Sequence, residues 1–122
     1  MHANKILHVL TQEYYQYAIQ IMKQEKNKLN FFIFSDDITW CKDNLFSLKE
    51  SVFIENKKSS SNYNELYMMS QCKNHIIANS SFSWWGAWLN PNNDKIIIAP
   101  KLWFKDSSYD DKDLMPESWI RI

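Results

Sequence analysis

Four short apolar runs alternate with longer helical segments along the 122-residue chain, and this alternation constrains the fold more than any other feature. The runs are residues 31–35, 52–55, 75–78 and 95–99. Each is apolar nearly throughout, which is typical of strands buried on both faces of a parallel sheet. The sequence therefore predicts an α/β fold in one domain: a Rossmann-like parallel sheet with helices on both faces.

The segments between the runs have helical periodicity or helix-capping residues. Helices are expected over residues 11–27, 37–46, 62–72 and 81–90. The tail from Lys101 is expected to be mostly irregular and anchored to the core by Trp103, Phe104, Trp119 and Ile120.

The most informative stretch reads NHIIANSSFSWWGAWL, from Asn74 to Leu89. Its apolar run stops at Asn79 and is followed by serines at 80, 81 and 83, where a helix is expected to begin. A helix N-terminus carries free N–H groups and a positive dipole end, so this junction predicts an anion site, most commonly for phosphate. The alternative is that Ser80 or Ser81 only caps the helix.

A second polar cluster, Ser35-Asp36-Asp37, follows the first apolar run. In open parallel sheets ligands bind at the carboxyl ends of the strands, so both clusters are expected at one edge. The two aspartates could cap a helix or accept hydrogen bonds from a base or a sugar. A guanine ring presents adjacent N–H donors that suit a carboxylate. A metal site would need further carboxylates nearby, and none is evident.

Gly86 is the only glycine, which excludes the dinucleotide-binding GxGxxG loop and the Walker A loop. The composition, 45% apolar and 16% aromatic, excludes intrinsic disorder, and the zero net charge gives no indication of a nucleic-acid partner. Cys41 and Cys72 have no CxxC spacing, so we expect reduced, buried thiols.

The start of the chain lacks the features of a signal peptide, and no apolar run reaches 18 residues. These features predict a cytoplasmic protein without a transmembrane segment; the alternative is peripheral association with the inner membrane.

Trp84, Trp85 and Trp88 lie at helical spacing. They could form a platform on which sugar rings stack, but helical spacing more often indicates core positions. We expect Trp88 to pack inward. The positions of Trp84 and Trp85 are not assigned from the sequence.

The segments FFIFSDDITWCKDNL, MMSQCKNHIIANSSFSWWGAWLN and KIIIAPKLWF resemble the bacterial α-1,2-fucosyltransferases of glycosyltransferase family 11. The resemblance extends to YYQYAI near the start and LMPESWIRI at the end, so it covers nearly the whole chain. It implies a GT-B-type fold of two Rossmann-like halves and inverting transfer of L-fucose from GDP-fucose to the 2-hydroxyl of a terminal galactose, without a metal ion. Residues 1–122 look like the carboxyl-terminal, donor-nucleotide half.

The resemblance also implies which residues bind the donor and which partners the chain has. The guanosine would face Ser35, Asp36 and Asp37. The diphosphate would lie near Asn79, Ser80, Ser81, Phe82 and Ser83. The implied partners are GDP-fucose, a galactose-terminated glycan, and an amino-terminal half or complementing chain. No catalytic residue is assigned.

The chain departs from the family in one respect. The family carries a His-x-Arg-Arg-x-Asp motif upstream of the matching segment, and Arg121 is the only arginine here. A positioned arginine stabilises the charge that develops on departing GDP, and losing such a group typically costs on the order of a hundredfold in rate. We therefore expect a fragment that is inactive in isolation and prone to self-association. The alternative is a non-catalytic GDP- or sugar-binding module or a truncated remnant.

Overall fold

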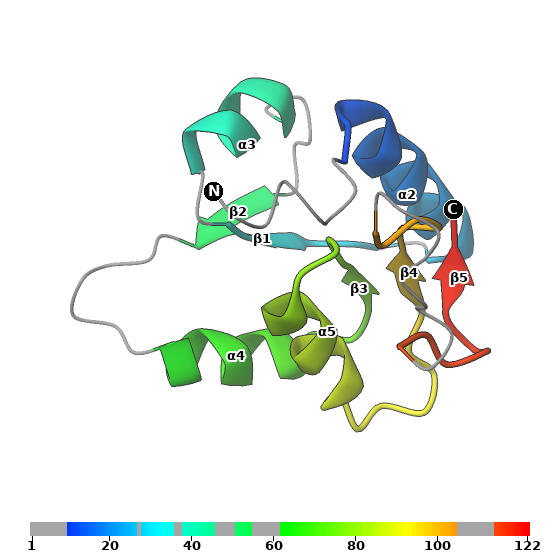
Figure 1. Cartoon of the computed structure of the whole chain (residues 1–122). Helices are drawn as coiled ribbons and strands as arrows, with labels where there is room; N and C mark the ends of the chain where they lie inside the picture. The colour runs from blue at the N-terminus through cyan, green and yellow to red at the C-terminus, as the bar shows by residue number, and fades with distance from the viewer. Residues whose placement is uncertain (1–9, 27, 36–37, 46–50, 55–61, 105–113) are drawn as a thin grey trace.

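The computed structural model of the chain describes residues 10–26, 28–35, 38–45, 51–54, 62–104 and 114–122. The helices are α2 (Gln12–Glu25), α3 (Ile38–Leu45), α4 (Asn62–Ser70) and α5 (Ser81–Trp88). The strands are β1 (Phe31–Phe34), β2 (Ser51–Ile54), β3 (His75–Ile76), β4 (Ile97–Ala99) and β5 (Ile120–Arg121). Helices and strands alternate up to β4 as the sequence predicts, which gives a mixed α/β architecture (Figure 1).

The strand pairing is parallel throughout the described residues, as predicted. It forms two sheets, however, and not the single sheet expected from the sequence. β1 pairs with β2, while β3, β4 and β5 form a three-stranded sheet in that order. Since β3 is only two residues long and bonds to β4, no ladder joins it to β1 in the part of the chain that is described. The polar ends of β1 and β3 therefore belong to different sheets.

The three-stranded sheet is covered on both faces, and β4 shows how. Ile97 and Ala99 belong to a core cluster with Ala87 of α5, whereas Ile98 between them packs with Ala18 and other residues of α2. Successive side chains of a strand point to opposite faces, so each face of β4 meets a different helix. The prediction of helices on both faces is confirmed for this sheet.

Helix α2 lies against the sheet through residues one turn apart. Ala18 and Met22 are buried, with Ile21 partly buried beside them. Tyr15 makes an edge-to-face contact with Trp40 of α3, with ring centroids 6.0 Å apart. Helix α2 therefore contacts both the sheet and α3.

The tail adds a strand that the sequence did not indicate. Trp103 and Trp119 are buried and Phe104 packs against them, as predicted. The prediction for Ile120 is wrong, because its side chain is 37% exposed and its backbone pairs with β4 as part of β5. Two residues are too short a run to show strand periodicity in a sequence.

Both cysteines are free thiols. Cys41 is buried as expected, whereas Cys72 is only half-buried, and burial raises the pKa of its thiol. None of the helices in the described ranges is both long enough and apolar enough to cross a membrane.

Candidate anion site at the start of helix α5

The start of α5 is capped by Ser80. Its backbone is extended, and its hydroxyl oxygen accepts a hydrogen bond from the Ser83 N–H at 3.1 Å. The same hydroxyl lies 3.1 Å from the Ser83 hydroxyl, to which it donates. The capping interpretation is therefore confirmed for Ser80. Because the Ser80 hydroxyl already donates to Ser83, a bound anion would accept from other donors at the helix start.

The cap leaves donors at the helix start. The Ser83 N–H bonds to the Ser80 side chain and the Trp84 N–H bonds to the Ser80 carbonyl. Among the described contacts, the Ser81 and Phe82 N–H groups have no intrachain acceptor. The Ser81 side chain is exposed beside them, while Phe82 and Ser83 are half-buried. Two free N–H groups and a hydroxyl at a helix N-terminus can hold a phosphate oxygen.

The loop before α5 is held from both sides of the sheet. The Asn79 amide nitrogen donates to the Trp103 carbonyl at 3.0 Å, which ties the loop to the segment after β4. The Tyr14 hydroxyl of α2 donates to the Ile77 carbonyl at 2.6 Å and lies 3.4 Å from the Ile98 carbonyl. These bonds fix the direction in which α5 begins.

Tyr14 is a residue that the sequence reasoning missed. Burial, with a smaller contribution from Tyr15, raises the pKa of Tyr14 well above its usual range, so its hydroxyl stays a neutral donor. A signal was present, because Tyr14, Ala18 and Met22 recur at every fourth position and mark the buried stripe of α2. The tyrosine at the end of that stripe needed a hydrogen-bond partner.

The cluster after β1 is only partly described. Ser35 is half-buried at the end of β1, whereas Asp36 and Asp37 lie outside the described residues. The structure thus brings Asn79 and residues 80–83 together at one helix start, but it does not test their expected proximity to the aspartates. Within the described ranges, no group of three or more His, Cys, Asp or Glu residues could hold a metal ion.

The tryptophans of α5 differ in burial, and the inward-facing one is Trp84 and not Trp88. Trp84 packs against the core, and its indole N–H donates to the Leu114 carbonyl at 2.5 Å. Trp88 was expected to face inward but is 51% exposed, stacked on Trp84 with ring centroids 5.3 Å apart. Residues four apart share one helix face, and the inner place on that face is already filled by Trp84. Trp85 is also about half exposed.

Comparison with known proteins places the chain in a family. The model of the family described as Glycosyl transferase family 11 matches residues 1–122. An alpha-1,2-colitosyltransferase of Escherichia coli is 45% identical over 98% of this chain and 42% of its own length. The O-antigen biosynthesis glycosyltransferase WbnK of Escherichia coli is 36% identical over 99% of this chain and 39% of its own length. No solved structure matches. The chain spans about two-fifths of the length of these curated relatives.

Proposed function

Because the chain belongs to glycosyl transferase family 11, we propose that it is the donor-binding part of an α-1,2-glycosyltransferase. The reaction proposed is inverting transfer of L-fucose from GDP-fucose to the 2-hydroxyl of a galactose acceptor. The observation that carries the proposal is the start of α5, where free N–H groups and serine hydroxyls follow a parallel strand. Such a helix start binds the diphosphate of a nucleotide sugar.

The proposed role of this chain in the reaction is to stabilise the leaving group. As the acceptor hydroxyl attacks the anomeric carbon, the bond to GDP breaks and negative charge grows on the departing diphosphate. The Ser81 and Phe82 N–H groups and the dipole of α5 stabilise that charge. The base that takes the acceptor proton and the arginine that assists departure are proposed to come from the further length that the relatives possess.

A relative's name supports a second donor. The Escherichia coli protein that is 45% identical to this chain is named for transfer of colitose with α-1,2 linkage. Colitose differs from L-fucose by lacking the 3-hydroxyl. GDP-colitose is therefore the alternative donor, and the proposed linkage is the same for both.

The experiment that tests the proposal is calorimetric titration of the chain with GDP. The informative variant is Ser80→Asp, because aspartate caps a helix as well as serine does but places a negative charge where the diphosphate is proposed. We expect its thermal stability to match that of the parent and its GDP affinity to fall at least tenfold. Ser118→Asp, at an exposed serine in the tail, is the control and should bind GDP as the parent does.

The Ser80→Ala, Ser81→Ala double variant removes both hydroxyls and is expected to lose GDP binding as well. Equal GDP affinity in the parent and in Ser80→Asp, or no binding by the folded parent, would overturn the donor-site assignment.

A binding module without transferase activity is the second candidate, because the start of α5 offers donors to a phosphate and the described residues supply no assigned base. It predicts GDP binding but no fucosylated product when the chain alone is given GDP-fucose and a galactose-terminated acceptor. Product formation by the chain alone would exclude it.

A further inference from the structure

Helix α5 is held at both ends by a buried asparagine. Asn79 lies two residues before the helix and is 9% exposed, and Asn90 lies two residues after it and is 3% exposed. The Asn79 amide nitrogen donates to the Trp103 carbonyl at 3.0 Å. The Asn90 amide nitrogen donates to the Cys72 carbonyl at 2.7 Å. A buried amide needs such a partner, so both bonds are part of the packed structure.

The two ends of α5 differ in what they carry. The amino end has the Ser80 cap and the Ser81 and Phe82 N–H groups that are proposed to hold the diphosphate. A helix of eight residues is about 12 Å long, so the carboxyl end lies well away from these donors. Asn90 therefore offers a matched position at which the same kind of bond has no access to the candidate anion site.

The Asn79 side chain is directed into the protein. Trp103, whose carbonyl accepts its bond, is 6% exposed and belongs to the core cluster that also contains Ala87 of α5. Turning the Asn79 amide toward a phosphate would take this donor away from a carbonyl in the core, which costs free energy. The amide is therefore better suited to fixing the backbone than to contacting a ligand.

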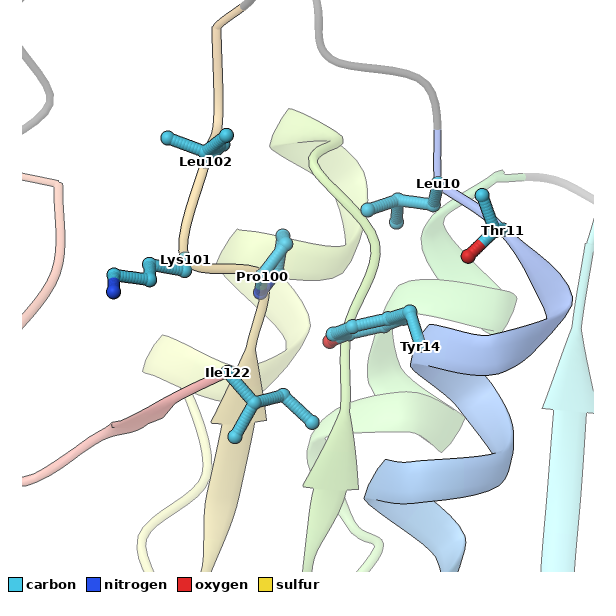
Figure 2. Close-up of a pocket in the computed structure, with 7 residues that line it drawn as sticks. All are labelled: Leu10, Thr11, Tyr14, Pro100, Lys101, Leu102 and Ile122. Atoms are coloured by element: carbon cyan, nitrogen blue, oxygen red, sulfur yellow. The ribbon is translucent and has the colours of Figure 1, made fainter.

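The backbone of Asn79 leads directly into the cap. Ser80, the next residue, has an extended backbone, and its hydroxyl lies 3.1 Å from the Ser83 nitrogen from which it accepts. The same loop is held from α2 as well: Figure 2 shows the Tyr14 side chain extending to the ribbon that leaves β3, where its hydroxyl donates to the Ile77 carbonyl. The loop is thus fixed at Ile77 and at Asn79, and the second point adjoins the cap.

We propose that Asn79 is a positioning residue for the nucleotide-sugar donor and not one of its ligands. Its bond to the Trp103 carbonyl holds Ser80 in the capping conformation, and the cap directs the Ser81 and Phe82 N–H groups toward the diphosphate. This assignment rests on the proposed function and deepens it, because it names a residue that acts on the donor only through the start of α5.

The test compares Asn79→Ala with Asn90→Ala. Each variant removes one buried amide at one end of α5, so a general loss of stability would affect both. The parent and the two variants are titrated calorimetrically with GDP. Hydrogen exchange, followed by NMR without GDP, measures the protection of two amides in α5: Ser83, which the cap protects, and Leu89, which bonds to the Trp85 carbonyl at the other end.

We expect Asn79→Ala to bind GDP roughly tenfold more weakly, because only a fraction of the ligand-free molecules then has the helix start in its binding conformation. Its Ser83 amide should exchange roughly tenfold faster than in the parent, while the Leu89 amide keeps its rate. Asn90→Ala should keep its GDP affinity and its Ser83 exchange within about twofold of the parent, since distant sites act independently. Asn79→Thr, which has a similar volume but no amide, gives the same result if Asn79→Ala does not fold.

The outcomes separate this assignment from the proposed function. If Asn79→Ala loses GDP affinity while its Ser83 amide keeps the protection of the parent, Asn79 contacts the donor directly and the positioning role is overturned. Unchanged GDP affinity in Asn79→Ala, or an equal loss in Asn90→Ala, also overturns it, and in each of these cases the diphosphate site stands. If the folded parent does not bind GDP, the proposed function fails and the assignment of Asn79 fails with it.

Discussion

At the scale of single residues, Gly86 is fixed by the packing of two helices. A Cβ atom at this position would lie 2.7 Å from Cγ of Met69 and 3.2 Å from its Cβ. The Met69 side chain of α4 therefore occupies the space that a Cβ atom at Gly86 of α5 would need. The backbone of Gly86 has no positive φ, so the requirement is space and not conformation.

Gly86→Ala is expected to destabilise the chain by about 1–3 kcal/mol, since the overpacking cost exceeds the gain in helix propensity. Urea unfolding measures the effect. In the Gly86→Ala, Met69→Ala double variant the clash is absent, so the loss in its free energy of unfolding should be smaller than the sum of the losses in the two single variants. Strict additivity would show that Met69 is not the obstacle.

The two stacked tryptophans differ in what they bury. Trp84→Ala removes core packing and the bond to the Leu114 carbonyl, and is expected to cost about 3 kcal/mol or more. Trp88→Ala removes a half-exposed ring and its stacking contact, and is expected to cost about 1 kcal/mol. Thermal unfolding of both variants measures the difference, and a larger loss for Trp88→Ala would mean that Trp88 is the inward-facing ring.

At the scale of elements, α2 and the three-stranded sheet are joined by the part-buried hydrogen bonds of the Tyr14 hydroxyl as well as by apolar contact. The Tyr14 hydroxyl reaches across the sheet edge to the Ile77 carbonyl, at the point where β3 leads toward α5. The bond connects a helix near the start of the described chain to the junction that carries the candidate anion site.

Tyr14→Phe is expected to cost about 1–2 kcal/mol, because the Ile77 carbonyl loses its part-buried donor. Tyr17→Phe is the matched control on the same helix: its side chain is 58% exposed, so its effect should stay within about 0.5 kcal/mol. Denaturant midpoints measure the difference in stability between the two variants. Equal midpoints would contradict a stabilising role for the Tyr14 bond.

At the scale of the whole molecule, a buried histidine at the amino end of β3 gives the fold a pH dependence. His75 Nε2 lies 2.9 Å from the Asn90 amide nitrogen, so a neutral ring accepts this bond and a protonated ring loses it. Burial, and secondarily the positive charge of Lys95, lowers the pKa of His75 to about 4.

The sign of the effect follows from proton binding. Between its ordinary pKa near 6.5 and about pH 4, His75 is protonated in the unfolded chain but neutral in the folded one. Stability from this residue is therefore complete above pH 6.5 and falls by roughly 3 kcal/mol as the pH drops to 4. Urea unfolding at intervals across this range measures the slope. His75→Asn should flatten it, and an unchanged slope would assign the pH dependence to other groups.

The exposed apolar side chains also act at this scale. Tyr67 and Met68 of α4 and Trp85 and Trp88 of α5 are about half exposed or more, on two helices that pack together. Exposed apolar residues promote association, so the prediction of self-association from the sequence is retained. Light scattering across a concentration series checks it, and a monomer at every concentration would contradict it.

The sequence by itself determined the alternation of helices and strands, the parallel pairing and the serine cap of α5. These features depend on local patterns: apolar runs such as residues 31–34, and a serine three residues before its backbone partner. The family resemblance was likewise carried by contiguous motifs, and the match over residues 1–122 confirms it.

Only the tertiary structure decided which residues meet across the chain. The Tyr14 bond to Ile77 joins positions 63 residues apart, and β5 exists because Ile120 and Arg121 can pair with β4. The division into two sheets and the outward position of Trp88 were decided in the same way. Each depends on which neighbour already occupies a strand edge or a core site, and local periodicity does not encode that competition.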